Sequence, residues 1–223
     1  MNRPNLTPPA GVLFDFDGVV VDSLTAHLNA WQFAYKKIFG ETLISTEGLA
    51  GRSTSAIARI LAEMAGQPNR APELIIDKKS HLSGSAMAIQ AMPGIPDAFN
   101  LLIKRKIPFG IASNAPRQFI EQTLTRLGIE HPVIVGVDDV LNPKPEPDVF
   151  LKCANLIGIS FLDHQRTIVF EDSTHGLHAA VKAGMHPIGV ETQHPRDILT
   201  ANGAIKTCVH ILNAMEEGYF FEI

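Results

Sequence analysis

The chain has 223 residues, and its hydrophobic content of 45% is enough for a sizeable buried core, which argues against a largely disordered protein. A formal charge of −4 and an isoelectric point near 6.1 give no broad electrostatic reason to bind nucleic acid or an anionic membrane. Residues 1–10 hold three prolines and no apolar run, and no stretch approaches the ~18 apolar residues of a membrane span, so we expect neither a signal peptide nor an anchor.

The first predicted element is a buried strand at residues 12–14, which ends in Asp15 and Asp17 with Gly18 after them. Strand side chains repeat every two residues, so both carboxylates point the same way, and Gly18 lets the backbone turn above them. Two close carboxylates favour a cation, and Mg²⁺ is the natural partner because it prefers oxygen ligands and is often completed by a substrate phosphate. Taken alone, Asp-x-Asp-Gly is also typical of a solvated strand end.

The next part of the chain, residues 22–89, predicts helices and no convincing strand. Apolar residues spaced by three and four predict amphipathic helices at residues 24–39, 54–65 and, with weaker periodicity, 73–82. An all-helical block between two parts of an α/β pattern indicates an inserted domain. We therefore expect a helical cap domain at residues 22–89 and an α/β core domain made of residues 1–21 and 90–223.

From residue 93 onward, helices and strands alternate, which is typical of βαβ units and a parallel sheet. Strands are predicted at residues 108–112, 133–137, 167–170 and 186–190. Helices are predicted at residues 96–106, 116–127, 148–156, 174–183, 197–202 and 211–217. The predicted fold class is α/β, with a Rossmann-like parallel sheet core and an inserted α-helical cap domain.

Polar residues follow several of these strands. Ser113 and Asn114 follow the strand at residues 108–112 and precede a helix, where a hydroxyl and backbone N–H groups favour an anion. Lys144 lies in a loop with three alternating prolines, which present its ammonium from a nearly fixed backbone. Taken alone, a serine here is usually a turn residue, and a lysine in a proline loop is usually solvated.

Glu171 and Asp172 come at the end of the strand predicted at residues 167–170. An acidic pair before a helix usually stabilises the helix by interacting with the positive N-terminal end of its dipole. Ligands of open α/β sheets bind at the carboxyl edge of the strands, however, so these residues can converge with Asp15 and Asp17 although they are far apart in sequence.

The string Asp-Phe-Asp-Gly-Val-Val-Val-Asp-Ser after a hydrophobic strand resembles the first signature of the haloacid dehalogenase superfamily. The Lys-Pro-x-Pro-Asp loop and the run from Glu171 to Met185 are similar to later motifs of this superfamily, in the same order. The resemblance implies that Asp15 is a nucleophile that takes a phosphoryl group as an aspartyl phosphate. It also implies that Asp17 is the general acid and base and lends its backbone carbonyl to the metal.

The resemblance further implies a Mg²⁺ site and a phosphate site. The implied metal ligands are Asp15, Asp17, Glu171 and Asp172, with Glu171 either ligating directly or orienting metal-bound water. The implied phosphate-binding residues are Ser113, Asn114 and Lys144. Lys144 adds a second positive charge and is expected to help keep Asp15 ionised, since a nearby cation lowers the pKa of a carboxylate.

The helical insertion resembles the cap of the beta-phosphoglucomutase-like branch of this superfamily. In that resemblance, His27 matches a histidine near the general acid and could reach Asp17 on closure, although a histidine at a helix start is more often structural. Arg52 falls in a substrate-facing cap loop and could clamp a second phosphate or a carboxylate. Lys79 is a weaker candidate for the same role.

The sequence thus predicts a magnesium-dependent phosphatase of a small phosphorylated metabolite, with a sugar phosphate as the expected substrate. The alternative is a beta-phosphoglucomutase-type sugar phosphomutase, in which the phosphoenzyme resists water for longer. Asp17 argues against the dehalogenase branch, which lacks the second acid. A signalling domain would be shorter, and a catalytically silent phosphate-binding module would be expected to have lost a charged site residue.

The sequence contains two cysteines, which bear on the compartment of the protein. Cys153 and Cys208 have neither metal-binding nor redox spacing, and each lies in an apolar segment, which is typical of reduced core thiols. We therefore expect a cytoplasmic protein, a monomer or a weak homo-oligomer, whose partner is a small phosphorylated substrate and not nucleic acid or a membrane.

Overall fold

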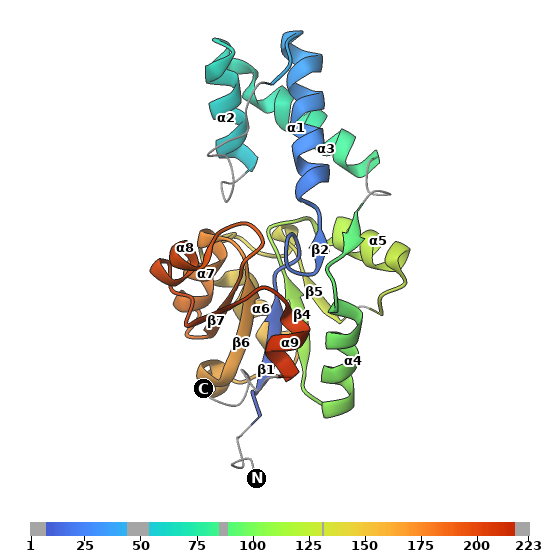
Figure 1. Ribbon diagram of the computed structural model, residues 1–223. Helices are drawn as coiled ribbons and strands as arrows, with labels where there is room; N and C mark the ends of the chain where they lie inside the picture. Colours follow the sequence, from blue (N-terminus) through green and yellow to red (C-terminus); the bar gives the residue numbers. More distant parts are fainter. Residues whose placement is uncertain (1–7, 44–53, 85–88, 131, 217–223) are drawn as a thin grey trace. The chain divides into compact units, whose positions relative to one another are not determined.

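The computed structural model describes residues 8–43, 54–84, 89–130 and 132–216 (Figure 1). The chain divides into two compact units. Unit 1 consists of Met1–Val21 and Ala91–Ile223, and unit 2 of Asp22–Gln90. Within the described ranges, no helix combines the length and the apolar character needed to cross a membrane.

Unit 1 contains a six-stranded parallel sheet with the order β5-β4-β1-β6-β7-β8. The strands are β1 (Gly11–Phe14), β4 (Phe109–Ala112), β5 (Val133–Val135), β6 (Thr167–Glu171), β7 (His186–Val190) and β8 (Lys206–Cys208). The chain runs from β1 outward to β5 and then returns to β6 on the other side of β1. This order confirms the predicted Rossmann-like core, and its topological switch point lies between β1 and β6.

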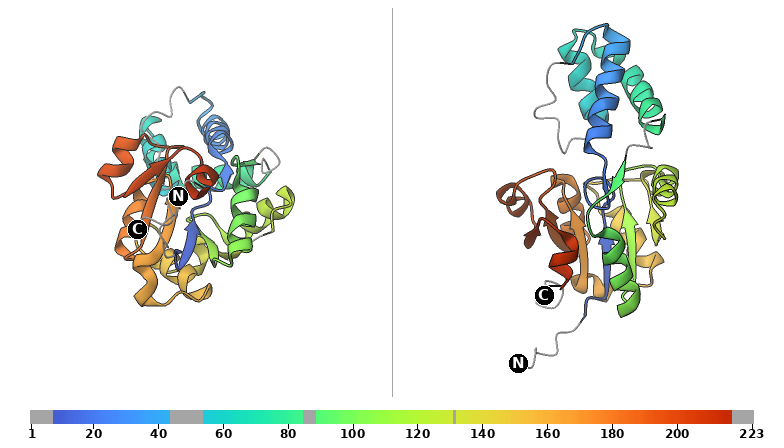
Figure 2. Two further views of the ribbon diagram at one scale, coloured as in Figure 1. Left: turned by 60° about the horizontal axis from the view of Figure 1, so that its bottom comes forward. Right: turned by 45° about the vertical axis from the view of Figure 1, so that its right-hand side comes forward.

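Helices flank this sheet, as Figure 2 shows from two further directions. They are α4 (Ile95–Arg105), α5 (Arg117–Leu127), α6 (Asp148–Leu156), α7 (Thr174–Lys182), α8 (Arg196–Ala201) and α9 (Ile211–Glu216). Short 3₁₀ helices, η3 (Val137–Asp139) and η4 (Phe161–Arg166), precede α6 and β6. The helices begin and end within a few residues of the predicted positions.

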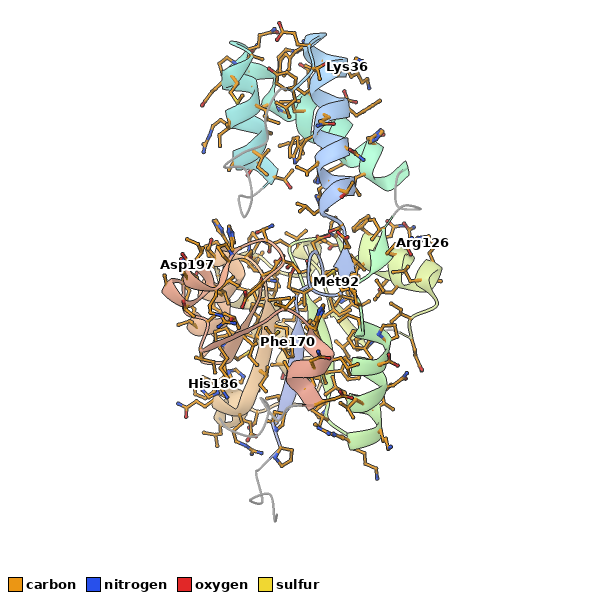
Figure 3. The ribbon with its side chains drawn as sticks, in the orientation of Figure 1. Lys36, Met92, Arg126, Phe170, His186 and Asp197 are labelled. Atoms are coloured by element: carbon orange, nitrogen blue, oxygen red, sulfur yellow. The ribbon has the colours of Figure 1, made fainter. Side chains whose placement is uncertain are left out.

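The core of unit 1 has two layers because neighbouring residues of β1 point to opposite faces of the sheet. Leu13 belongs to a buried cluster with Phe150 of α6 and residues of α7. Phe14 instead packs against Phe99 of α4 and stacks on Phe170 of β6, which lies among the inner side chains in Figure 3. Both faces of β1 are therefore covered, which explains why its sequence is continuously apolar.

Strand β8 is not predicted by the sequence pattern. Its residues Lys206, Thr207 and Cys208 form no apolar run, and the strand lies at the edge of the sheet, where it pairs with β7. An edge strand needs no second apolar face, so hydrophobic periodicity carries little signal there.

Unit 2 is built from α1 (Leu24–Phe39), α2 (Thr54–Met64), the 3₁₀ helix η1 (Pro68–Arg70) and α3 (Ala71–Gly84). Its own core joins the three α-helices through Trp31, Tyr35, Leu61 and Leu74, together with smaller side chains. Helix α1 ends at Gly40, whose φ of 76° is the left-handed conformation that glycine adopts at low cost. Helix α3 is longer than the predicted helix at residues 73–82.

Two very short strands mark the points where the chain leaves and re-enters unit 1. Strand β2 (Val21–Asp22) forms a two-stranded sheet with β3 (Gln90–Ala91). Beside them, the Met92 N–H donates a hydrogen bond to the Val20 carbonyl. The sequence pattern predicts no strand at either point, because two residues are too few to show a period.

Candidate active site

The register of the sheet brings the first aspartate next to the acidic pair. Phe14 lies opposite Phe170 in the parallel pairing of β1 and β6, so the residues that follow them, Asp15 and Glu171, are neighbours. The Asp15 N–H donates a 2.9 Å hydrogen bond to the Phe170 carbonyl, which joins the two strand ends. Asp15, Glu171 and Asp172 are all buried, and one carboxylate oxygen from each lies within 4.8 Å of the others. We call these three residues the acidic cluster.

Lys144 supplies a positive charge to the acidic cluster. Its side chain is 3% exposed, and its Nζ lies 2.5 Å from Asp15 Oδ1 and 2.8 Å from Glu171 Oε2. The ammonium also lies over the Phe150 ring, 4.6 Å from the ring centroid, at a distance typical of a cation–π contact. The loop after β5 therefore delivers Lys144 to the edge where β1 and β6 end.

The pKa of Asp15 is raised, whereas the sequence analysis expected the nearby Lys144 to lower it. Lys144 does favour the ionised carboxylate, as expected, but burial and the negative charge of Glu171 outweigh it, and the pKa of Asp15 is raised to about 7. Asp17 adds a smaller contribution in the same direction. One ammonium does not balance the acidic cluster, because taking carboxylates out of water strongly disfavours their charge.

Asp172 is disfavoured as an anion for similar reasons. Burial and then the charges of Glu171 and Asp15 raise its pKa well above the usual range, while a hydrogen bond from Thr192 acts in the opposite direction. The buried carboxylates thus carry more negative charge than Lys144 neutralises. Their oxygens are the ligands that a hard cation such as Mg²⁺ prefers, and such an ion would balance the remaining charge. The residues present therefore fit a Mg²⁺ ion.

The Glu171 carboxylate contacts both Lys144 and Ser173. Lys144 binds Oε2, and Oε1 accepts hydrogen bonds from the backbone N–H and the hydroxyl of Ser173. A Cβ at Gly176 would overlap with this carboxylate, so the glycine allows α7 to approach it. These contacts suit an anchor for Lys144, and the role of Glu171 in holding metal stays a prediction.

Asp17 lies on the turn after β1 and is half-buried. It is close enough to contribute to the raised pKa of both Asp15 and Asp172. The turn is closed by a 2.8 Å hydrogen bond from the Gly18 N–H to the Val21 carbonyl, and Gly18 has a φ of +78°. The predicted roles of Asp17, proton transfer and metal binding through its carbonyl, stay predictions.

Ser113 and Asn114 follow β4, as predicted. The buried Ser113 hydroxyl accepts a hydrogen bond from the Ala115 N–H. The Asn114 side chain binds the backbone of Lys144 twice: its Oδ1 accepts from the Lys144 N–H at 3.0 Å, and its Nδ2 donates to the Lys144 carbonyl at 3.2 Å. Asn114 thus positions the lysine loop, a role that its sequence context does not reveal, and phosphate binding by Ser113 and Asn114 stays a prediction.

In unit 2, His27 is paired with a lysine that the sequence analysis missed. His27 Nδ1 lies 3.1 Å from Nζ of Lys78, which is 4% exposed and lies over the Trp31 ring. Lys79, the residue singled out from the sequence, is exposed. A signal for Lys78 exists, because it lies four residues after Leu74 on the buried side of α3. Arg52 lies outside the described residues.

Comparisons with known proteins identify the family of this chain. The profile of the haloacid dehalogenase-like hydrolase family matches residues 12–190. Hexitol phosphatase A of Escherichia coli is 31% identical over 183 residues, covering 81% of this chain and 82% of that protein. Fructose-1-phosphate phosphatase YqaB of the same organism is 28% identical over 190 residues, covering 81% and 96%. The crystal structure of a putative beta-phosphoglucomutase from Thermotoga maritima superposes with a TM-score of 0.72 at 25% identity, covering 93% of this chain and 98% of that one.

Proposed function

Because the chain belongs to the haloacid dehalogenase-like hydrolase family, we propose that it is a magnesium-dependent phosphatase of a small phosphorylated metabolite, most specifically a sugar phosphate. One observation carries the proposal: the buried Lys144 ammonium joins Asp15 to Glu171, with Asp172 in the same acidic cluster. Two relatives support the choice of substrate class, because one is named a fructose-1-phosphate phosphatase and the other a hexitol phosphatase.

In the proposed reaction, a carboxylate oxygen of Asp15 forms a bond to phosphorus while the bond from phosphorus to the ester oxygen breaks. Asp17 gives its proton to the departing oxygen, which leaves as an alcohol. Asp17 then takes a proton from a water molecule, whose oxygen bonds to the phosphorus of the aspartyl phosphate. The bond between phosphorus and the Asp15 oxygen breaks, and inorganic phosphate and a free carboxylate remain.

The surrounding residues would lower the cost of bringing two anions together. Lys144 holds Asp15 in place and adds positive charge beside the transferring phosphoryl group. Asp15 and Asp172 would hold Mg²⁺, with Asp17 contributing its backbone carbonyl and Glu171 supporting the site. When bound, this ion supplies charge neutralisation for the carboxylates and the phosphoryl group. His27 and Arg52 are proposed to contact the substrate.

A sugar phosphomutase is the second candidate, and it is favoured by the likeness to the putative beta-phosphoglucomutase. The two activities share the first phosphoryl transfer and differ in what accepts the phosphoryl group from Asp15.

A reducing compartment such as the cytoplasm would keep Cys153 and Cys208 as the free thiols seen in this chain.

The test is phosphate release from a panel of sugar phosphates and other small phosphorylated metabolites, with and without Mg²⁺. Magnesium-dependent release supports the phosphatase. The panel includes beta-glucose 1-phosphate with trace glucose bisphosphate, since its conversion to glucose 6-phosphate without release would assign the mutase.

Asp15→Asn is the matched mechanistic variant, because it keeps the size of the side chain and removes the nucleophile. We expect it to abolish phosphoenzyme formation and to lower turnover by a factor of at least about 10³, a loss typical of removing a covalent nucleophile. Acid-quenched labelling with a ³²P-labelled substrate checks the phosphoenzyme. Turnover at the wild-type rate by Asp15→Asn would overturn the mechanism.

A further inference from the structure

Thr192 lies on the loop that follows β7, and its hydroxyl reaches two parts of the active site. Its Oγ1 lies 2.8 Å from the Gly18 carbonyl oxygen and 3.0 Å from Asp172 Oδ2. The loop is itself anchored, because the Thr192 N–H donates to the Val190 carbonyl and the Glu191 N–H donates to the Cys208 carbonyl of β8. The position of the hydroxyl is therefore set by the end of the sheet.

The Gly18 turn passes directly against the same carboxylate. A Cβ at Gly18 would overlap with Asp172 Oδ2 and would lie 3.4 Å from Thr192 Oγ1. The backbone of the turn, the carboxylate of Asp172 and the hydroxyl of Thr192 thus meet at one point. Each of the three belongs to a different segment of the chain, after β1, β6 and β7.

We propose that Thr192 is a positioning residue that fixes the Asp172 carboxylate and the Gly18 turn together, and so raises the affinity of the Mg²⁺ site. This inference rests on the proposed function. It goes beyond that function because Thr192 belongs to none of the motifs that define the site, and the run Glu191-Thr192-Gln193 carries no pattern that points to it.

The chemistry of a hydroxyl suits this role. Thr192 has one hydroxyl hydrogen, and the Gly18 carbonyl oxygen and Asp172 Oδ2 are both acceptors. The hydroxyl shares this hydrogen between them and so attracts the turn and the carboxylate to the same point. Contact at Oδ2 limits rotation of the Asp172 carboxylate, which is otherwise repelled by its acidic neighbours. Partners that orient metal ligands in this way commonly contribute 10- to 100-fold, as an order of magnitude, to metal affinity.

The test compares Mg²⁺ binding to the full-length wild type and to Thr192→Val, which removes the hydroxyl at nearly constant volume. Isothermal titration calorimetry without substrate gives the dissociation constant, and thermal unfolding without Mg²⁺ checks the fold. We expect Thr192→Val to bind Mg²⁺ roughly 10-fold or more weakly and to need correspondingly more Mg²⁺ for half-maximal phosphate release. Thr192→Ser, which keeps the hydroxyl, should remain within about threefold of the wild type.

Two further variants keep the test decisive. Thr200→Val is the matched control, since the Thr200 hydroxyl binds the Arg196 and Asp197 carbonyls within α8, and its Mg²⁺ affinity should equal that of the wild type. Thr192→Ala removes the same hydroxyl without an added methyl contact and serves if the valine variant does not fold. Wild-type Mg²⁺ affinity in a folded Thr192→Val or Thr192→Ala protein would overturn the role of Thr192 alone. A wild type that neither binds Mg²⁺ nor releases phosphate would overturn the proposed function as well.

Discussion

At the scale of single residues, the candidate active site contains a buried ammonium, that of Lys144, whose charge does not balance the carboxylates around it. Lys144 contacts Asp15 and Glu171, yet the pKa of Asp15 is raised to about 7 because burial and Glu171 together outweigh the ammonium. A carboxyl whose pKa rises on folding binds its proton more tightly in the folded state. Without metal, the proton on Asp15 therefore contributes stability that is lost as pH rises from about 4 through about 7.

The same raised pKa predicts that protons compete with Mg²⁺. Metal binding needs the ionised carboxylate, so Mg²⁺ affinity should fall as pH drops below about 7. Displacement of one proton with that pKa makes the dissociation constant about tenfold larger at pH 6 than at pH 8, and the raised pKa of Asp172 adds to the effect. Calorimetric titration of the metal-free protein at the two pH values measures this, and equal affinities would contradict it.

At the scale of elements, the loop after β5 and helix α6 place Lys144. Asn114 binds the Lys144 backbone at both its N–H and its carbonyl, and Phe150 of α6 lies under the ammonium. Phe150 is also fully buried in the cluster that joins α6 and α7 to the sheet. One side chain thus contributes both to the core of unit 1 and to the position of a charged residue.

We expect Phe150→Ala to lower the free energy of unfolding by about 3–5 kcal/mol, because it leaves a cavity under α6. Phosphate release should fall further than the folded fraction explains, since Lys144 loses its aromatic contact. Urea unfolding followed by circular dichroism measures the first effect, and an activity assay at low urea measures the second.

Phe161→Ala provides the matched control for this prediction. Phe161 is 80% exposed in η4, so the same substitution should change the unfolding free energy by no more than about 0.5 kcal/mol. Similar losses of stability in the two variants would contradict the assignment of Phe150 to the core.

At the scale of the whole molecule, each unit has its own hydrophobic core. The core of unit 2 contains Trp31, the only tryptophan in the sequence, so tryptophan fluorescence reports on unit 2. The acidic cluster belongs to unit 1. The two units can therefore be observed by different probes in the same protein.

Leu61→Ala should lower the free energy of unfolding of unit 2 by about 2–5 kcal/mol, because Leu61 is fully buried in the core of this unit. Unfolding of unit 2 is followed by the fluorescence of Trp31. Mg²⁺ affinity should stay at the wild-type value under native conditions, since the acidic cluster lies in unit 1. Met64→Ala is the control on the same helix, where the side chain is 59% exposed. Loss of Mg²⁺ binding in a folded Leu61→Ala protein would show that the cluster depends on unit 2.

The sequence by itself determined the α/β class, the helical insertion and the order of the strand-end residues, because hydrophobic periodicity and short motifs are local properties. It also singled out Asp15, Lys144, Glu171 and Asp172, which the sheet brings together. It missed the edge strand β8 and the two-residue strands β2 and β3, which have no period long enough to detect.

Only the tertiary structure decided how these residues act on one another. The raised pKa of Asp15 results from burial and from a glutamate far away in the chain, so the local sequence suggested the opposite direction. The contacts of Asn114 with Lys144 and of Thr192 with Gly18 and Asp172 likewise join distant segments. Chain order determines which residue follows each strand, whereas the balance of charge and the hydrogen-bond partners depend on how the strands are packed side by side.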